Sequence, residues 1–81
     1  MKLTYDPTAN IAYIQLRKKK AKVKTIRVSD ELNVDMAADG SIYGIELLNA
    51  NAQLSADRRN AVVVENEASG ESSEIALAVP V

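Results

Sequence analysis

The side chains best suited to chemistry form a basic run in the first third of the chain. Seven lysines and arginines lie between residues 17 and 27. At this density, positive side chains can neutralise phosphates and release counterions from DNA or RNA. The same charges also suit a solvated connector that keeps an edge strand from aggregating. The candidate contacts for an anion or a nucleic acid are Arg17, Lys18, Lys19, Lys20, Lys22, Lys24 and Arg27.

Residues that usually carry catalysis are scarce. The chain has no histidine and no cysteine, which removes the commonest general base near neutral pH and the thiolate nucleophile. Two carboxylates can still act as acid and base, but only when they are held together with separated pKa values. Asn33 and Asp35 instead share the expected polar face of a strand. We therefore expect no enzyme, no catalytic residue and no cofactor.

A near match to a calcium-binding loop surrounds an Asp-Gly pair. Asp35, Asp39, Gly40 and Glu46 follow the loop spacing, but the second ligand-bearing position is Ala37, whose side chain has no oxygen. The flanking residues alternate as in strands, whereas a calcium loop needs helices. A β-hairpin with an Asp-Gly turn produces the same residue pattern. We therefore expect no metal site, and we assign Asp39 and Gly40 a structural role in a two-residue turn.

Apolar and polar residues alternate with a period of two in five segments between residues 2 and 48, which indicates strands. Short turns separate most of them, at 6–10, 29–31 and 39–40. We expect an all-β, mainly antiparallel fold built as a small meander of consecutive hairpins. Gly44, inside a strand, predicts a bulge or a close backbone approach. The side chains expected to face inward are Leu3, Tyr5, Ile14, Leu16, Ile26, Val28, Leu32, Val34, Ile45 and Leu47.

The last third of the chain follows a looser pattern. Residues 55–59 could form one helical turn with Ser55 as its N-cap. The β-prone runs at 62–64 and 75–79 flank a turn at 69–73 and predict a C-terminal hairpin, which Pro80 ends because proline cannot donate to a ladder.

The size and composition of the chain limit its core. The 81 residues form one domain, 1–81, and they include three tyrosines but no Phe and no Trp. One layer of sheet cannot bury both of its faces, so a second layer must come from the C-terminal part of the chain or from another copy. We therefore expect a homo-oligomer, most simply a dimer.

Charge is divided unevenly along the sequence. Residues 1–28 contain eight basic residues and one acidic residue, and residues 29–81 contain ten acidic and two basic ones. Such a division can mark a bipolar surface. No apolar run approaches the roughly 18 residues of a membrane span, the first residues lack the apolar stretch of a signal peptide, and cysteine is absent. These features predict a cytoplasmic protein that does not enter a membrane.

Several short motifs occur together in one order. They are Tyr5-Asp6-Pro7, the strand 12–16, Asn33-Val34-Asp35, Asp39-Gly40 and the segment 44–50. In this order the chain resembles the family called domain of unknown function 2283 over about residues 1–52, which leaves 53–81 as a C-terminal extension. The resemblance implies a small, mostly bacterial protein with no assigned activity or catalytic residues. Some members resemble components of toxin–antitoxin-type gene pairs, which implies a protein-binding module.

Two functions of different classes remain. The first is a non-enzymatic protein-interaction module that self-associates and binds a protein partner, with its acidic C-terminal half directed at a basic one. The alternative is a weak, sequence-nonspecific nucleic-acid binder that uses the basic 17–27 region.

Overall fold

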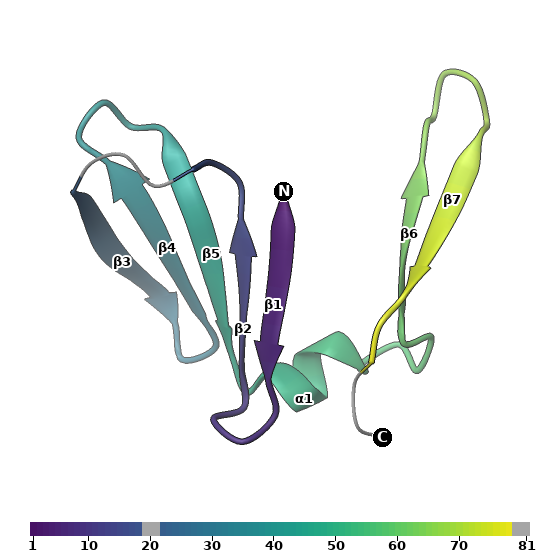
Figure 1. Cartoon of the computed structure of the whole chain (residues 1–81), viewed down its shortest axis with the longest axis horizontal. Coiled ribbons are helices and arrows are strands. Elements are labelled where there is room, and N and C mark those ends of the chain that lie inside the picture. Colours follow the sequence, from purple (N-terminus) through teal and green to yellow (C-terminus); the bar gives the residue numbers. More distant parts are fainter. Residues whose placement is uncertain (19–21, 79–81) are drawn as a thin grey trace.

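The computed structural model describes residues 1–18 and 22–78. These residues form seven strands and one short helix (Figure 1), and all strand pairs are antiparallel, so the predicted fold class is confirmed. In chain order the elements are β1 (Lys2–Asp6), β2 (Ile11–Gln15), β3 (Val23–Ser29), β4 (Leu32–Ala37), β5 (Ile42–Leu48), α1 (Ala50–Leu54), β6 (Ala61–Glu65) and β7 (Ser72–Ala76).

The first five strands form one sheet in the order β1-β2-β5-β4-β3. The predicted hairpins β1–β2, β3–β4 and β4–β5 are present, but the sheet is not a simple meander, because β2 pairs with β5 and β3 lies at the far edge. The charged connection from β2 therefore leads to the opposite edge of the sheet instead of making a tight turn. Lys19 and Lys20, two of the predicted contacts, lie outside the described residues.

Gly44 explains why β5 accepts β2 as its neighbour. A Cβ atom at Gly44 would overlap the ring of Tyr13, at 2.6 Å from Cε2, so the ring lies directly over the glycine backbone. The β4–β5 register also shifts between Asp35 and Met36, beside this glycine. Both features predicted for Gly44, a bulge and a close approach, are confirmed.

The turn between β4 and β5 differs from the predicted two-residue type. Its bonds run from the Gly40 amide to the Ala37 carbonyl (3.0 Å) and from the Ala37 amide to the Ser41 carbonyl (2.8 Å). The loop thus has three residues, and only Gly40, with φ 91°, takes a positive φ. This is the pattern of a turn followed by a left-handed residue. Asp39 accepts hydrogen bonds from the Ser41 amide and hydroxyl, at 2.9 and 2.6 Å, and these bonds lower its pKa.

The short helix begins five residues before the predicted helical turn. α1 starts after Asn49, whose left-handed backbone (φ 53°) ends β5 and redirects the chain. Ala50 can then lie fully buried, which a polar residue at that place could not do. Ser55 follows the helix as its C-cap rather than preceding it as an N-cap, and its hydroxyl donates to the Asn51 carbonyl at 2.6 Å.

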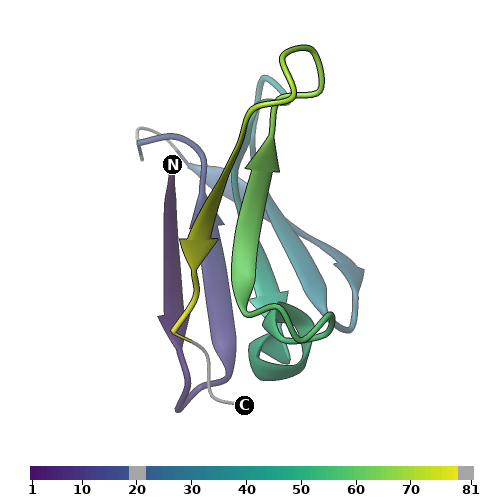
Figure 2. The same ribbon diagram turned by 90° about the vertical axis from the view of Figure 1, so that its right-hand side faces the viewer.

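The predicted C-terminal hairpin is confirmed as β6 and β7, which pair with each other in a separate two-stranded sheet, but β7 begins at Ser72, inside the turn predicted at 69–73, and ends at Ala76. Its loop is closed by hydrogen bonds between Asn66 and Glu71 and between Gly70 and Asn66, both 2.8 Å. Val79 and Pro80 lie outside the described residues. Figures 1 and 2 show the hairpin standing beside the five-stranded sheet, joined to it through α1.

Full burial is rare in this fold. Within 1–18 and 22–78, the buried residues are Ala12, Gly44 and Ala50, so alanine provides the only buried side chains. The side chains predicted to face inward are mostly half-buried, and Leu3, Leu16 and Val28 are exposed, Val28 at a register shift in β3. In the described part of the chain, no helix is long and apolar enough to cross a membrane.

We expect Gly40→Val to destabilise the protein by about 1–3 kcal/mol, because a β-branched residue is strained at φ 91°. The measurement is urea unfolding at one fixed protein concentration. Ala38→Val, in the same loop but without a positive φ, is the matched control and should change stability by less than about 0.5 kcal/mol. Equal effects of the two substitutions would show that the turn does not depend on Gly40.

Candidate functional site: an open apolar face beside an acidic hairpin

Apolar rows cross one face of the five-stranded sheet, which also carries Lys24 beside Met36 at the β3 edge. The register aligns Leu3, Ile14, Ile45, Val34 and Ile26 in a row that crosses all five strands. A second row beside it contains two leucines, a tyrosine and an alanine. We call this surface the open face, and its members are Leu3, Tyr5, Ala12, Ile14, Ile26, Leu32, Val34, Met36, Ile45 and Leu47.

The open face keeps contact with solvent. Apart from Ala12, every member is half-buried or exposed, and Leu3 retains 37% of its accessible surface. Monomeric proteins rarely leave a contiguous apolar patch of this extent uncovered. This face is therefore the first candidate for binding another surface.

Amides fix α1 at one end of the open face. Asn10 accepts hydrogen bonds from the backbone amides of Ala50 (on its carbonyl, 3.1 Å) and Asn51 (on its side chain, 2.7 Å). The Tyr5 hydroxyl, on the open face, donates to the Asn51 side chain. Gln53 donates to the carbonyls of Glu31 and Leu48, at 2.8 and 2.5 Å. We call this group of contacts the joint. From the sequence, no element or contact was assigned to 49–53, where the density of Asn and Gln was the available signal.

The hairpin β6–β7 also has an apolar side. Val62 pairs with Ile75, and Val64 lies on the same side, two residues along β6. Val62 and Ile75 expose 41% and 58% of their surface. The other side carries Val63 opposite Glu74. This apolar side is thus exposed, more than the half-buried side chains of the open face.

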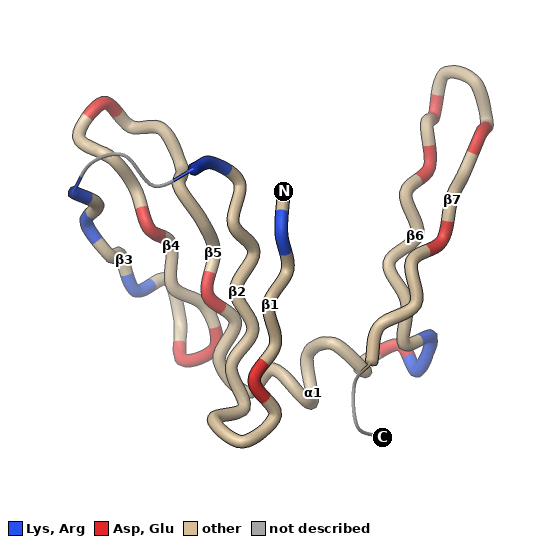
Figure 3. Tube along the Cα trace, viewed as in Figure 1, with Lys and Arg blue, Asp and Glu red and all other residues tan. Residues whose placement is uncertain are grey.

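Charge separates the two apolar surfaces. Residues 61–77 contain Glu65, Glu67, Glu71 and Glu74 but no lysine or arginine. In Figure 3 the basic segments gather on β3 and at the end of the sheet where β1 begins, whereas the strands and loop of the hairpin carry only acidic ones. The acidic loop of the hairpin lies at the same end of the molecule as this basic end of the sheet.

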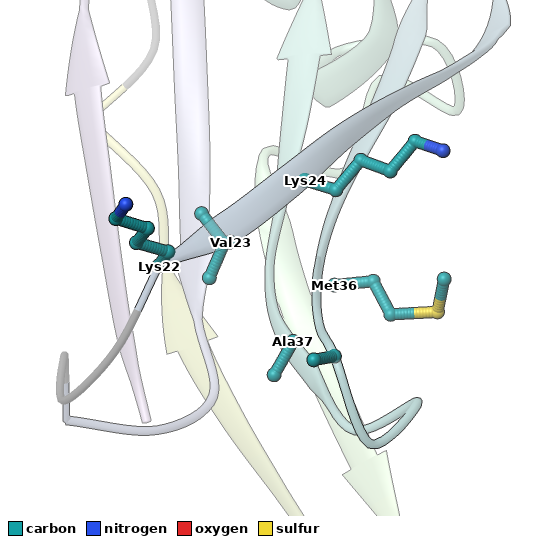
Figure 4. A pocket seen from close by; sticks show the side chains of 6 residues that line it. Lys22, Val23, Lys24, Met36 and Ala37 are labelled. Atoms are coloured by element: carbon teal, nitrogen blue, oxygen red, sulfur yellow. The ribbon is translucent and has the colours of Figure 1, made fainter.

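The structure divides the predicted basic contacts among separate places. Lys22 and Lys24 line a shallow pocket of about 360 Å³ at the edge of the sheet, together with Val23, Met36, Ala37 and Ala38 (Figure 4). Arg17 and Lys18 line a neighbouring pocket of about 240 Å³. Arg27 belongs to the opposite face from Lys24 by register and forms an ion pair with Asp30 at 2.7 Å. The basic run is therefore not one continuous patch.

Hydrogen bonds between strands join side chains on the polar face of the sheet. The hydroxyls of Tyr13 and Thr25 donate to the two oxygens of Asp35, at 2.7 and 2.6 Å. Asn33 donates to Glu46 at 2.9 Å. Burial, followed by the hydrogen bond to Asp35, raises the pKa of Tyr13 far above its ordinary value. Asp35 and Glu46 thus serve the sheet, and no cluster of three metal-binding side chains occurs among the described residues.

The family model described as "Protein of unknown function (DUF2283)" matches residues 2–51. No curated protein and no solved structure matches the chain. The matched range begins at β1 and ends inside α1. It therefore contains the open face and most of the joint, and it stops before the hairpin.

We expect Tyr13 to stay protonated at pH values where free tyrosine, with a pKa of about 10, ionises. Its raised pKa contributes stability below pH 10, and this contribution is lost as the pH rises above that value. Absorbance titration should show one more ionising tyrosine in the wild type than in Tyr13→Phe, and this tyrosine should ionise at the highest pH. If the ionisation that Tyr13→Phe removes has its midpoint near pH 10, this result would contradict the hydrogen bond between Tyr13 and Asp35.

Proposed function

We propose that this chain, which belongs to the DUF2283 family, is a non-enzymatic protein-interaction module that self-associates through the open face. The observation that carries the proposal is a sheet face that apolar rows cross on all five strands and whose side chains, apart from Ala12, keep contact with solvent. Burial of apolar surface is the main favourable term in association. A second surface laid on this face supplies the layer that the chain lacks.

The accessible surface of the chain supports this proposal. A compact monomer of 8.8 kDa exposes about 4,800 Å², whereas this chain exposes 6120 Å². The excess, about 1,300 Å² per chain, exceeds the roughly 800 Å² that each partner buries in a standard interface. The chain thus has enough uncovered surface for a stable complex.

The proposal assigns no catalytic step to the protein. Neither histidine nor cysteine is in the sequence. The carboxylates on the polar face, Asp35 and Glu46, accept hydrogen bonds from Tyr13, Thr25 and Asn33. These groups are therefore committed to neighbouring strands rather than directed at a substrate.

We place this function in the cytoplasm of a bacterial cell, as part of a protein pair of the toxin–antitoxin type. The four glutamates of the hairpin suit a basic protein partner in addition to a second copy. A copy that first self-associates would present two acidic hairpins to such a partner.

Leu3→Lys tests self-association. Leu3 is on the open face, so a lysine there places a charge in the proposed interface and should weaken the dimer by about tenfold or more. Thr4→Lys adds the same charge to the same strand on the other face and is the matched control. Sedimentation equilibrium at micromolar concentration measures both. A monomeric wild type would reject the proposal.

A second candidate function is binding of nucleic acid. The observation in its favour is that Lys22 and Lys24 flank one pocket, with Arg17 and Lys18 at the next. Two adjacent basic pockets on one sheet edge can follow a phosphate backbone without reading its sequence.

Salt dependence tests this second function. Replacing Lys22 and Lys24 by Ser should flatten the dependence of log K on log salt by about 1.8 for duplex DNA, about 0.9 per lost phosphate contact. The control replaces Arg58 and Arg59 by Ser, which removes the same charge next to the hairpin. If no oligonucleotide binds even at low salt, this second function is rejected.

A further inference from the structure

We propose that the surface covering the open face is the β6–β7 hairpin of a second copy, and that two copies exchange hairpins reciprocally. This inference rests on the proposed function and adds to it the identity of the partner and the segment that docks. Each copy supplies one open face and one hairpin. The exchange therefore closes on itself as a two-fold dimer, with the same contact made twice.

The hairpin has the chemistry that the open face needs. Its apolar side, with Val62, Val64 and Ile75, is more exposed than any member of the open face. An isolated two-stranded hairpin is at best marginally stable in water and gains its stability by packing on another surface. In one chain, the open face and the apolar side of the hairpin thus each lack an apolar surface to pack against.

The joint explains why a chain does not cover its own open face. Hydrogen bonds that Asn10 accepts and that Gln53 donates hold α1 on the end of the sheet. After α1, the turn to β6 contains Arg58 and Asn60, both with positive φ (61° and 52°). This connection leads the hairpin away from the sheet, as Figures 1 and 2 show. Closure onto its own sheet would require a chain to rebuild the turn or the joint, whereas exchange requires neither.

Charge supports the same arrangement. The hairpin carries four glutamates and no basic residue, and residues 1–28 carry eight basic residues and one acidic residue. A two-fold axis along the strands keeps the acidic loop of the partner's hairpin at the end of the sheet where basic segments gather. Opposite charges then meet at the rim of the interface, where they speed association and fix orientation.

The available area matches an exchanged dimer. The radius of gyration, 14.2 Å, exceeds the roughly 12 Å expected for a compact chain of this length. If each copy buries its excess surface, the dimer buries about 2,600 Å² in total, which lies in the range of obligate homodimers. A dimer that used only part of one face would leave most of this excess exposed.

Val62→Ser and Val63→Ser form a matched pair for testing the exchange in the full chain. The two valines are adjacent and expose 41% and 38% of their surface, but they lie on opposite sides of the hairpin. We expect Val62→Ser to weaken the dimer by about tenfold or more and Val63→Ser by less than about threefold. Circular dichroism of both variants checks that the strands remain folded.

Mixing variants identifies the exchange itself. Leu3→Lys damages the open face, and Ile75→Glu damages the hairpin, so each variant alone forms a weak dimer. A mixed dimer has one intact contact and a second in which Lys and Glu attract each other. We expect sedimentation of the mixture to show a heterodimer tighter than either homodimer.

Three results would overturn the inference, and they separate it from the proposed function. Equal effects of Val62→Ser and Val63→Ser, or a mixture no tighter than its components, would reject exchange while leaving self-association through the open face intact. A wild type that is monomeric at micromolar concentration would reject both. In that case the hairpin would have to cover the sheet of its own chain.

Discussion

The uncovered apolar face of the sheet is the constraint on which the rest of this structure depends. The chain builds five strands but supplies only a five-residue helix against them, and it has no Phe or Trp to fill the remaining space. In the described part of the chain the two buried side chains are both alanines, one in β2 and one in α1, the elements that touch, and the third buried residue is Gly44. Since burial of apolar surface drives folding, a second surface on this face would add to the stability of the fold.

The two faces of the sheet differ in how far the chain can satisfy them alone. On the polar face, Tyr13, Thr25 and Asp35 close a hydrogen-bonded group across three strands, and Asn33 does the same with Glu46. Gly44 makes room for the Tyr13 ring in the middle of that face. Hydrogen bonds can be completed locally by side chains on neighbouring strands, whereas an apolar face needs a second layer. This asymmetry is the reason why the proposed partner is placed on the apolar face.

Period-two alternation predicted the strands and the residues that share the open face, because side chains alternate strictly along a strand. Strand order was beyond the same reasoning: β2 and β5 are far apart in the sequence, and their pairing depends on the complementary shapes of Tyr13 and Gly44. The β4–β5 turn was assigned to the right residues but to the wrong type, since Asp-Gly also occurs at the end of a three-residue loop. The joint was missed because its asparagines act across the fold, and Asn49 adopts a left-handed backbone that no local pattern demanded. The basic run was correctly identified as charged, but its division between two faces follows from register, which a list of residues does not contain.

The family match ends inside α1, so the framework and its proposed cover belong to separable parts of the chain. Residues 2–51 hold the sheet, and the hairpin begins ten residues later. Evolution can therefore alter the hairpin without disturbing the packing of the sheet. Two related chains that share this framework but differ in residues 61–77 would each recognise copies of themselves and ignore the other. In a genome with several such genes, the C-terminal segment would determine which copies associate and would prevent association between the products of different genes.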